Sequence, residues 1–266
     1  MTTAVEQLEQ ELQQQLGNVM FGMQQTIHGL CVALVAQGHV LLEGPPGQGK
    51  TLLAKSLAEI LKGEFKRIQC TADMMPSDLT GIHVFDKQSN NFKLLPGPLF
   101  ADVVLVDEIN RTGPKTQSSL LQAMEEGVIT LDRQTYELPK DFFLLASQNP
   151  FDFEGVYPLP ESQLDRFLLR LQIGYPDVNT EMEVLRHYDM PGGGHLDHHA
   201  KLNAISEGLL SSARQQVTAV HVSEGLYRYV ADIARASRSE PRLSLGLSTR
   251  GALALMRCAR VQAACE

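Results

Sequence analysis

Gly44-Pro45-Pro46-Gly47-Gln48-Gly49-Lys50-Thr51 is the stretch that decides the fold. It matches the phosphate-binding loop pattern of Gly, four residues, Gly, Lys and then Ser or Thr. The apolar run 40–42 precedes it, and a helical pattern follows it between residues 52 and 61. Glycines let several backbone N–H groups converge on one anion, and the N-terminus of a helix adds positive potential at that point. The sequence therefore predicts a strand, a loop and a helix that together bind a nucleoside triphosphate.

Two side chains of this loop are suited to phosphate chemistry. Lys50 can reach the outer phosphates, and the hydroxyl of Thr51 can hold Mg²⁺. The alternative is an ordinary loop, rich in glycine and proline, between a strand and a helix. Because the strand, the loop, the Lys-Thr pair and the helix all agree, we favour nucleotide binding.

The composition is that of a globular protein with an acidic body. The 266 residues suggest one large or two modest domains, and a hydrophobic content of 43% allows a proper core. Residues 1–200 carry 14 Lys and Arg against 26 Asp and Glu, a charge of −12, and residues 201–266 carry 9 against 5, a charge of +4. An acidic body argues against a protein whose main task is to bind nucleic acid.

The sequence shows no sign of export or of a membrane span. Its first residues are polar and rich in Gln and Glu, unlike a signal peptide. The longest apolar run near the start, residues 30–36, is far shorter than the ~18 residues that a membrane-spanning helix needs. Cys31, Cys70, Cys258 and Cys265 lack paired or metal-type spacing, so we expect reduced thiols in a cytoplasmic protein.

Short apolar runs alternate with helical patterns along much of the chain. The runs predict strands at 40–42, 103–106 and 142–146, and further strands are expected at 65–70 and 168–173. Helices are expected at 4–16, 23–37, 52–61, 114–125, 178–188, 201–214, 223–237 and 249–264, and hairpins at 82–95 and 128–138. This order indicates an α/β fold in which helices cover both faces of a parallel sheet.

Gly174-Tyr175-Pro176-Asp177 is the clearest boundary in the chain. Beyond it the sequence has helical patterns and no further buried-strand runs. We therefore predict an α/β nucleotide-binding core at residues 1–176 and a smaller, all-helical domain at residues 177–266. His195, His198 and His199 follow three glycines in an expected surface loop, which is a poor place for a preformed metal site.

An acidic pair ends one of the expected strands. Asp107 lies 57 residues after Lys50, at the tip of the apolar run 103–106, and Glu108 follows it. Asp107 can hold Mg²⁺ through water beside the phosphate loop. Consecutive residues of a strand point to opposite sides, so the two carboxylates can have different tasks. Glu108 can then orient or deprotonate the attacking water. The alternative is a pair of plain loop residues.

Three further polar residues are candidates for the reaction. Asn149 ends a strand that should lie between the two motif strands, where an amide can reach the γ-phosphate or the water; a turn-forming Asn before proline is the alternative. Arg166, before the last strand, could meet the developing charge from another subunit, or form a structural ion pair. Arg250 would lie in the first turn of a helix, where the helix dipole is unfavourable for a cation. A nucleotide phosphate nearby would explain this position. The alternative is a solvated arginine.

With these residues the chain resembles a MoxR-type ATPase of the AAA+ superfamily, in its helix-2-insert clade. The motifs appear in the family's order over nearly the whole chain. They are 38–51, Pro96-Gly97-Pro98, Asp107-Glu108-Ile109-Asn110-Arg111, Gln122-Ala123-Met124-Glu125-Glu126, Ser147-Gln148-Asn149-Pro150 and 155–176. The resemblance implies a P-loop NTPase sheet followed by a helical lid.

The resemblance also implies roles for individual residues. Gly44 to Thr51 would be Walker A, Asp107 and Glu108 Walker B, Asn149 sensor 1, Arg166 the arginine finger and Arg250 sensor 2. Contacts to ATP would come from Met20, Phe21 and Gly22 at adenine, and from Gly44, Pro45, Pro46, Gly47, Gln48, Gly49, Lys50, Thr51 and Leu52 at the phosphates. The hairpin near 80–96 resembles the helix-2 insert, and the one near 128–138 resembles the pre-sensor-1 insertion.

For function, the resemblance implies an ATP- and Mg²⁺-dependent remodelling or maturation factor. It would form a homo-oligomer, a hexameric ring, whose hairpins touch a protein client, with von Willebrand A-domain proteins as frequent partners. A nucleic-acid motor and a nucleotide-switched scaffold are the alternatives. Relatives usually continue beyond the position of Glu266 with further lid helices, so we expect a lid that is short at its C-terminus.

Overall fold

The computed structural model describes residues 2–150, 155–189 and 202–265. Within them, five parallel strands form a sheet in the order β2-β5-β8-β1-β9. The strands are β1 Val40–Glu43, β2 Phe65–Gln69, β5 Val103–Asp107, β8 Phe143–Gln148 and β9 Leu169–Gln172. Strand β8 lies between β5 and β1, which confirms the expected position of the strand that ends beside Asn149.

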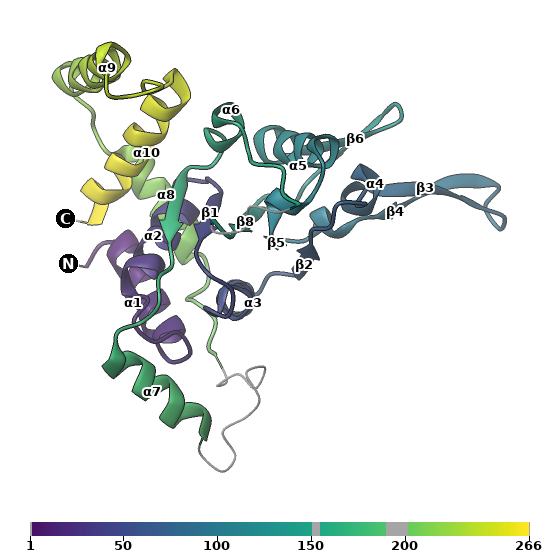
Figure 1. Cartoon of the computed structure of the whole chain (residues 1–266), viewed down its shortest axis with the longest axis horizontal. Coiled ribbons are helices and arrows are strands. Elements are labelled where there is room, and N and C mark those ends of the chain that lie inside the picture. Colours follow the sequence, from purple (N-terminus) through teal and green to yellow (C-terminus); the bar gives the residue numbers. More distant parts are fainter. Residues whose placement is uncertain (1, 151–154, 190–201, 266) are drawn as a thin grey trace.

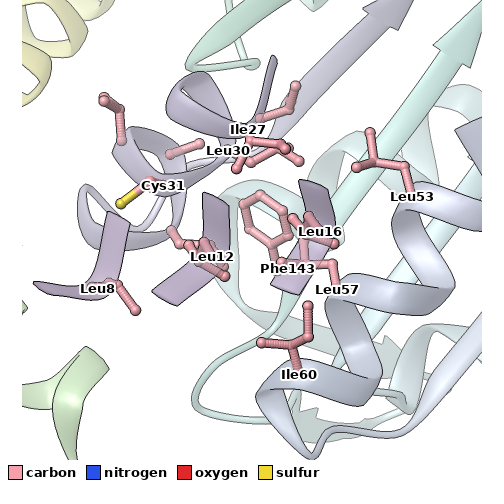
Figure 2. Close-up of a cluster of buried hydrophobic side chains, with 14 of the residues drawn as sticks. Leu8, Leu12, Leu16, Ile27, Leu30, Cys31, Leu53, Leu57, Ile60 and Phe143 are labelled. Carbon is pink, nitrogen blue, oxygen red and sulfur yellow. The ribbon is translucent and has the colours of Figure 1, made fainter. Parts of the chain in front are cut away.

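Helices cover both faces of the sheet, as predicted (Figure 1). Alternate side chains of β1, β5 and β8 point to one face, where α1 (Ala4–Gly17), α2 (Gln24–Val35) and α3 (Lys50–Leu61) pack on them. In α1, Val5, Leu8, Leu12 and Leu16 form the buried stripe. Figure 2 shows these leucines meeting Ile27, Leu57 and Phe143 in one apolar cluster. Burial of this continuous layer is the main force that holds the helices to the sheet.

The other face of the sheet packs on a different set of elements. Leu41, Val104, Val106, Leu144 and Ala146 point to it. Helix α5 (Pro114–Glu126) covers them, with α4 (Pro76–Thr80) and the short 3₁₀ helices η1 (Pro98–Phe100) and η2 (Ile109–Arg111) beside it. Because neighbouring residues of a strand face opposite layers, strands buried on both sides are apolar without interruption.

Two hairpins project from the body, at the side away from α9 and α10 (Figure 1). They are β3 (Gly81–Asp86) with β4 (Asn91–Pro96), and β6 (Val128–Leu131) with β7 (Gln134–Glu137). His83 joins them: its Nδ1 lies 2.8 Å from Asp132 Oδ2 and its Nε2 lies 2.8 Å from the hydroxyl of Tyr136. The two hairpins are therefore linked by side chains as well as by the body.

In the described part of the chain beyond residue 176, helices are the only regular secondary structure. They are α7 (Val178–Asp189), α8 (Leu209–Ala219), α9 (Glu224–Ser239) and α10 (Thr249–Cys265); the short α6 (Glu161–Leu164) precedes β9. Gln216 ties α8 to both ends of the chain. Its Oε1 accepts from Ala4 N at 2.9 Å, and its Nε2 donates to Ala264 O at 3.1 Å. Ser248 caps α10 by accepting a hydrogen bond from Gly251 N at 2.8 Å.

The predicted helix at 201–214 is wrong at its start, because α8 begins at Leu209. Leu202 is buried in the cluster under α1, and Ile205 N donates to Ile60 O at 3.0 Å. Ser206 binds Glu11 through both its N–H and its hydroxyl. These contacts hold the segment along α1 and α3 instead of in a helix. The histidines after the triple glycine lie outside the described residues.

The described helices include none that combines the length and the apolar character needed to cross a lipid bilayer.

A buried histidine connects the sheet to α5. His39, directly before β1, accepts a hydrogen bond from Leu144 N through Nδ1 and donates to Met124 O through Nε2, each at 3.1 Å. Both ring nitrogens are satisfied in the neutral form. Burial lowers the pKa of His39 to about 4 from 6.5.

This histidine should make the fold sensitive to acid. Between pH 6.5 and about 4 the unfolded chain binds a proton at His39 that the folded chain does not, so stability falls as the pH falls. Across this whole pH range the free energy of unfolding should fall by roughly 3 kcal/mol, at about 1.4 kcal/mol for each pKa unit. Urea unfolding at a series of pH values should show a weaker dependence for His39→Gln than for the wild type. The exposed His221→Gln serves as control and should keep the wild-type slope.

Candidate active site

The phosphate-binding loop lies between β1 and α3, as predicted. Gly49, with φ of 74°, precedes the first residue of α3 in a left-handed conformation that glycine adopts easily. At Gly44 the backbone of the neighbouring strand end comes close: a Cβ there would lie 2.0 Å from Ile173 O. Both glycines are thus required by geometry, one by its conformation and one by a close approach.

Lys50 lies across the mouth of this loop. Its Nζ donates to Gly44 O at 2.5 Å, so the side chain curls back over the turn. Burial lowers the pKa of Lys50, while the nearby carboxylates of Asp107, Glu108 and Glu43 oppose that shift. A half-buried ammonium held at this glycine-rich loop is a suitable partner for a multiply charged phosphate.

The loop opens onto a cavity of about 380 Å³ at the carboxyl ends of the strands. Residues chosen from sequence meet there: the loop residues 46–52, with Lys50 and Thr51 among them, and Asp107, Glu108 and Asn149. Crevices outside the carboxyl ends of the strands are where open α/β sheets bind ligands. The structure thus brings together the loop, the acidic pair and the amide, which lie almost one hundred residues apart in the sequence.

Thr51 and Asp107 fit the hard oxygen ligands that Mg²⁺ prefers, and they line the same cavity. Asp107 is held in place by two bonds: Ser147 Oγ donates to its Oδ1 at 2.5 Å and Arg67 Nη2 to its Oδ2 at 2.6 Å. Within the described residues no group of three or more His, Cys, Asp or Glu forms a self-sufficient metal site. This set suits an ion that is bound partly by the nucleotide's own phosphates.

A kink in the backbone sets the direction of the Glu108 side chain. Our expectation that strand alternation sets this direction was therefore wrong. Strand β5 ends at Asp107, and Glu108 has φ of 57° and ψ of 51°, a left-handed conformation uncommon for residues other than glycine. Its N–H donates to Ser147 Oγ at 2.9 Å, which stabilises the kink. Its Oε2 lies 3.0 Å from both Gln69 Nε2 and Arg111 Nε. Strained backbone of this kind is typical of functional residues.

A second hollow of about 610 Å³ adjoins the first, because Gly47, Gln48, Gly49 and Leu52 line both. The residues expected at adenine, 20–22, form one wall of it. Tyr188 and other residues of α7 form another wall, so the hollow lies between the α/β core and the first helix beyond residue 176. The structure therefore places the expected base pocket next to the expected phosphate pocket.

Arg166 and Arg250 do not line either of these cavities. Both line a third hollow of about 360 Å³, with Gly38, His39 and Leu168. These residues precede β1 and β9, so the arginines lie at the amino ends of strands whose carboxyl ends border the nucleotide cavity. Both arginines pair with Glu125. Arg166 therefore forms an ion pair, which was the alternative considered for it, and the alternative that Arg250 is simply solvated is wrong.

Sequence analysis missed three residues that shape the site: Arg67, Gln69 and Ser147. Arg67 and Gln69 alternate with the buried Ile68 on β2, so both point to the side where the acidic tip of β5 ends. Ser147 is buried and touches both acidic residues. The polar end of the apolar strand β8 was a visible signal for Ser147, and the polar residues of β2 were visible as well, but their partners depend on which strands are neighbours.

Comparisons with known proteins agree with this geometry. Residues 39–169 match the ATPase family associated with various cellular activities (AAA), and residues 235–266 match an AAA lid domain. The chain is 42% identical to the protein YeaC of Bacillus subtilis over 93% of the chain and 76% of YeaC. It is 36% identical to the chaperone MoxR1 of Mycobacterium tuberculosis over 91% of the chain and 65% of MoxR1.

A solved structure is also similar. The crystal structure of a candidate ATPase from Cytophaga hutchinsonii superimposes with a TM-score of 0.85 and 34% sequence identity, over 98% of this chain and 80% of that one. The likeness includes the sheet and the helices that follow it.

Proposed function

Since the chain belongs to the MoxR-type AAA ATPases, we propose that it binds ATP with Mg²⁺, hydrolyses it, and uses the energy to remodel or mature a protein client. The observation that carries the proposal is the 380 Å³ cavity, where a phosphate loop, a lysine, two acidic residues and an amide converge. The arrangement suits water as the nucleophile, because the carboxylate of Glu108, next to the metal ligand Asp107, can accept its proton.

Each residue of the cavity has a distinct task in this proposal. The loop amides and Lys50 bind the β- and γ-phosphates. Thr51 and Asp107 would hold Mg²⁺, which neutralises charge on the phosphates when it is bound. Glu108, held by Ser147 and Gln69, orients the water and takes its proton, and Asn149 positions the γ-phosphate or the water.

The arginines imply that the site is completed by a second copy of the chain. Arg166 and Arg250 lie at the opposite ends of the strands from the phosphate loop, so neither lines the cavity of its own subunit. In a head-to-tail ring they would face the nucleotide of the neighbouring subunit, and we propose a hexamer. Heterologous contacts of this kind close into rings when the rotation allows it.

The hairpins are the proposed client-contacting elements. On β3 and β4, Ile82, Phe85, Phe92 and Leu95 are exposed, and the two phenylalanine rings lie 5.4 Å apart. An exposed apolar patch on a projecting element favours contact with another protein over contact with nucleic acid. A von Willebrand A-domain protein would be a suitable partner, and the His83 bridge would let both hairpins transmit one motion.

We place the protein in the cytoplasm, where thiols stay reduced. Within the described residues no disulfide joins any of its cysteines, and two of them, Cys31 and Cys70, are buried. Burial raises the pKa of the Cys70 thiol to about 12, which keeps it protonated and unreactive.

ATP hydrolysis measured against protein concentration tests the proposal. The rate per subunit should rise with concentration, because assembly brings arginines to each nucleotide. Lys50→Ala should abolish both ATP binding and turnover, and Lys55→Ala, which removes a lysine from the edge of the same cavity, should keep most of the binding. Hydrolysis that is absent in assembled wild-type protein, or unchanged in Lys50→Ala, would contradict the proposal.

A further inference from the structure

Glu125 contacts both of the arginines that lie far from the nucleotide cavity. It is in the last turn of α5. Its Oε2 lies 3.4 Å from Arg166 Nη1, and its Oε1 accepts a hydrogen bond from Arg250 Nη2. Arg166 follows α6 and Arg250 is in the first turn of α10, so one carboxylate joins arginines from two separate parts of the chain.

Without an anion between them, the two guanidinium groups would repel each other. Arg257, on the same helix as Arg250, lines the same hollow and adds to the positive charge. Moreover, the buried Nε of Arg166 makes no hydrogen bond within the described residues. The direction of Arg166 therefore depends strongly on its pairing with Glu125.

The backbone that carries Glu125 is firmly held. The carbonyl of the preceding residue, Met124, accepts the hydrogen bond from the buried ring of His39. On the lid side, Ser248 Oγ donates to Asp165 Oδ2 at 2.7 Å, which fixes the start of α10 next to Arg166. Glu125 thus lies at a rigid point of the core, facing a helix end that is tied to the core as well.

We propose that Glu125 is a positioning residue for ATP hydrolysis. It holds Arg166 and Arg250 side by side, so that both reach the phosphates of the nucleotide in the neighbouring subunit at once. The inference rests on the proposed function, in which these arginines act between subunits. Glu125 does not line the nucleotide cavities of its own chain and touches no nucleotide, so it acts through the arginines.

Glu125→Gln tests this inference, with Glu126→Gln as the matched control. Glu126 is the next residue; it is exposed and bonded to Gln122, and its substitution changes the charge equally. For Glu125→Gln we expect kcat to fall on the order of ten- to a hundred-fold, because small displacements of catalytic groups have effects of this size. ATP affinity, measured by titration, and the midpoint of thermal unfolding should stay at the wild-type values. Glu125→Asp keeps the charge and should recover part of the rate.

Mixed assemblies separate this inference from the proposed function. Arg166→Ala subunits mixed with Lys50→Ala subunits should regain activity, because the second subunit supplies intact arginines to the nucleotide site of the first. Glu125→Gln with Lys50→Ala should also regain activity, whereas Glu125→Gln with Arg166→Ala should not.

The outcomes are distinct. If Arg166→Ala is rescued but Glu125→Gln shows a normal kcat, or is not rescued by Lys50→Ala, the role of Glu125 is wrong and the proposed function stands. If Lys50→Ala rescues neither variant, the arginines do not act between subunits, and both proposals fail together.

Discussion

Arg166→Ala should reduce ATP turnover by about 10³- to 10⁵-fold, the range found for arginines that complete a site for phosphoryl transfer. The guanidinium would stabilise the charge that develops on the phosphate of a neighbouring subunit. Binding of ATP should remain, since Arg166 does not line the nucleotide cavities of its own chain. Steady-state hydrolysis at several protein concentrations, together with an ATP titration, measures both effects.

The loss should persist at every protein concentration, whereas wild-type activity should rise as subunits assemble. Arg228→Ala is the control, because Arg228 is a largely exposed arginine of α9 that lies 3.9 Å from Asp232. It should leave the rate unchanged. A variant at Arg166 that unfolds at lower temperature but hydrolyses ATP at the wild-type rate would show that its pairing with Glu125 is structural alone.

Glu108→Gln should retain ATP binding while turnover falls by about 10²- to 10⁴-fold. An amide has nearly the shape of a carboxylate but cannot accept the proton of the attacking water. The contacts with Gln69 and Arg111 restrain the side chain, and the kinked backbone is stabilised through the N–H, which the substitution leaves in place. Single-turnover hydrolysis after saturation with ATP isolates this step from binding.

Glu64→Gln provides the matched control for this second prediction. Glu64 is exposed before β2 and pairs with Lys66 at 2.9 Å, away from the nucleotide cavity. It should hydrolyse ATP at the wild-type rate. Equal single-turnover rates for Glu108→Gln and the wild type would exclude Glu108 as the base and would leave water activation to another group.

Local patterns predicted the elements of this fold well. The phosphate loop, the apolar strands and the two hairpins were visible in the sequence because each depends on neighbouring residues: glycines in a turn, or an uninterrupted apolar run. The start of α8 was not visible. The sequence predicted a helix from residue 201, but contacts with α1 and α3, distant in sequence, hold the segment before Leu209 in another conformation.

The candidate site was predicted in part. The loop and the acidic pair follow from short motifs, and the position of Asn149 followed from the expected strand order. Arg67 and Ser147 could not be assigned, because their importance comes from the carboxylate of Asp107 on a neighbouring strand. We had attributed the different directions of the Asp107 and Glu108 side chains to strand alternation. That reason was wrong, since Glu108 lies beyond the end of the strand.

The sequence by itself determined that this chain has a phosphate-binding loop followed by an acidic strand tip, because both are local patterns of residue type and spacing. Only the tertiary structure decided which partners the remaining polar side chains have. It set Arg67 and Ser147 beside Asp107, and it placed Arg166 and Arg250 together on Glu125 at the opposite ends of the strands. Ion pairs and hydrogen bonds depend on distance in space, and it is the packing of the sheet and its helices that brings residues from separate parts of the chain within reach.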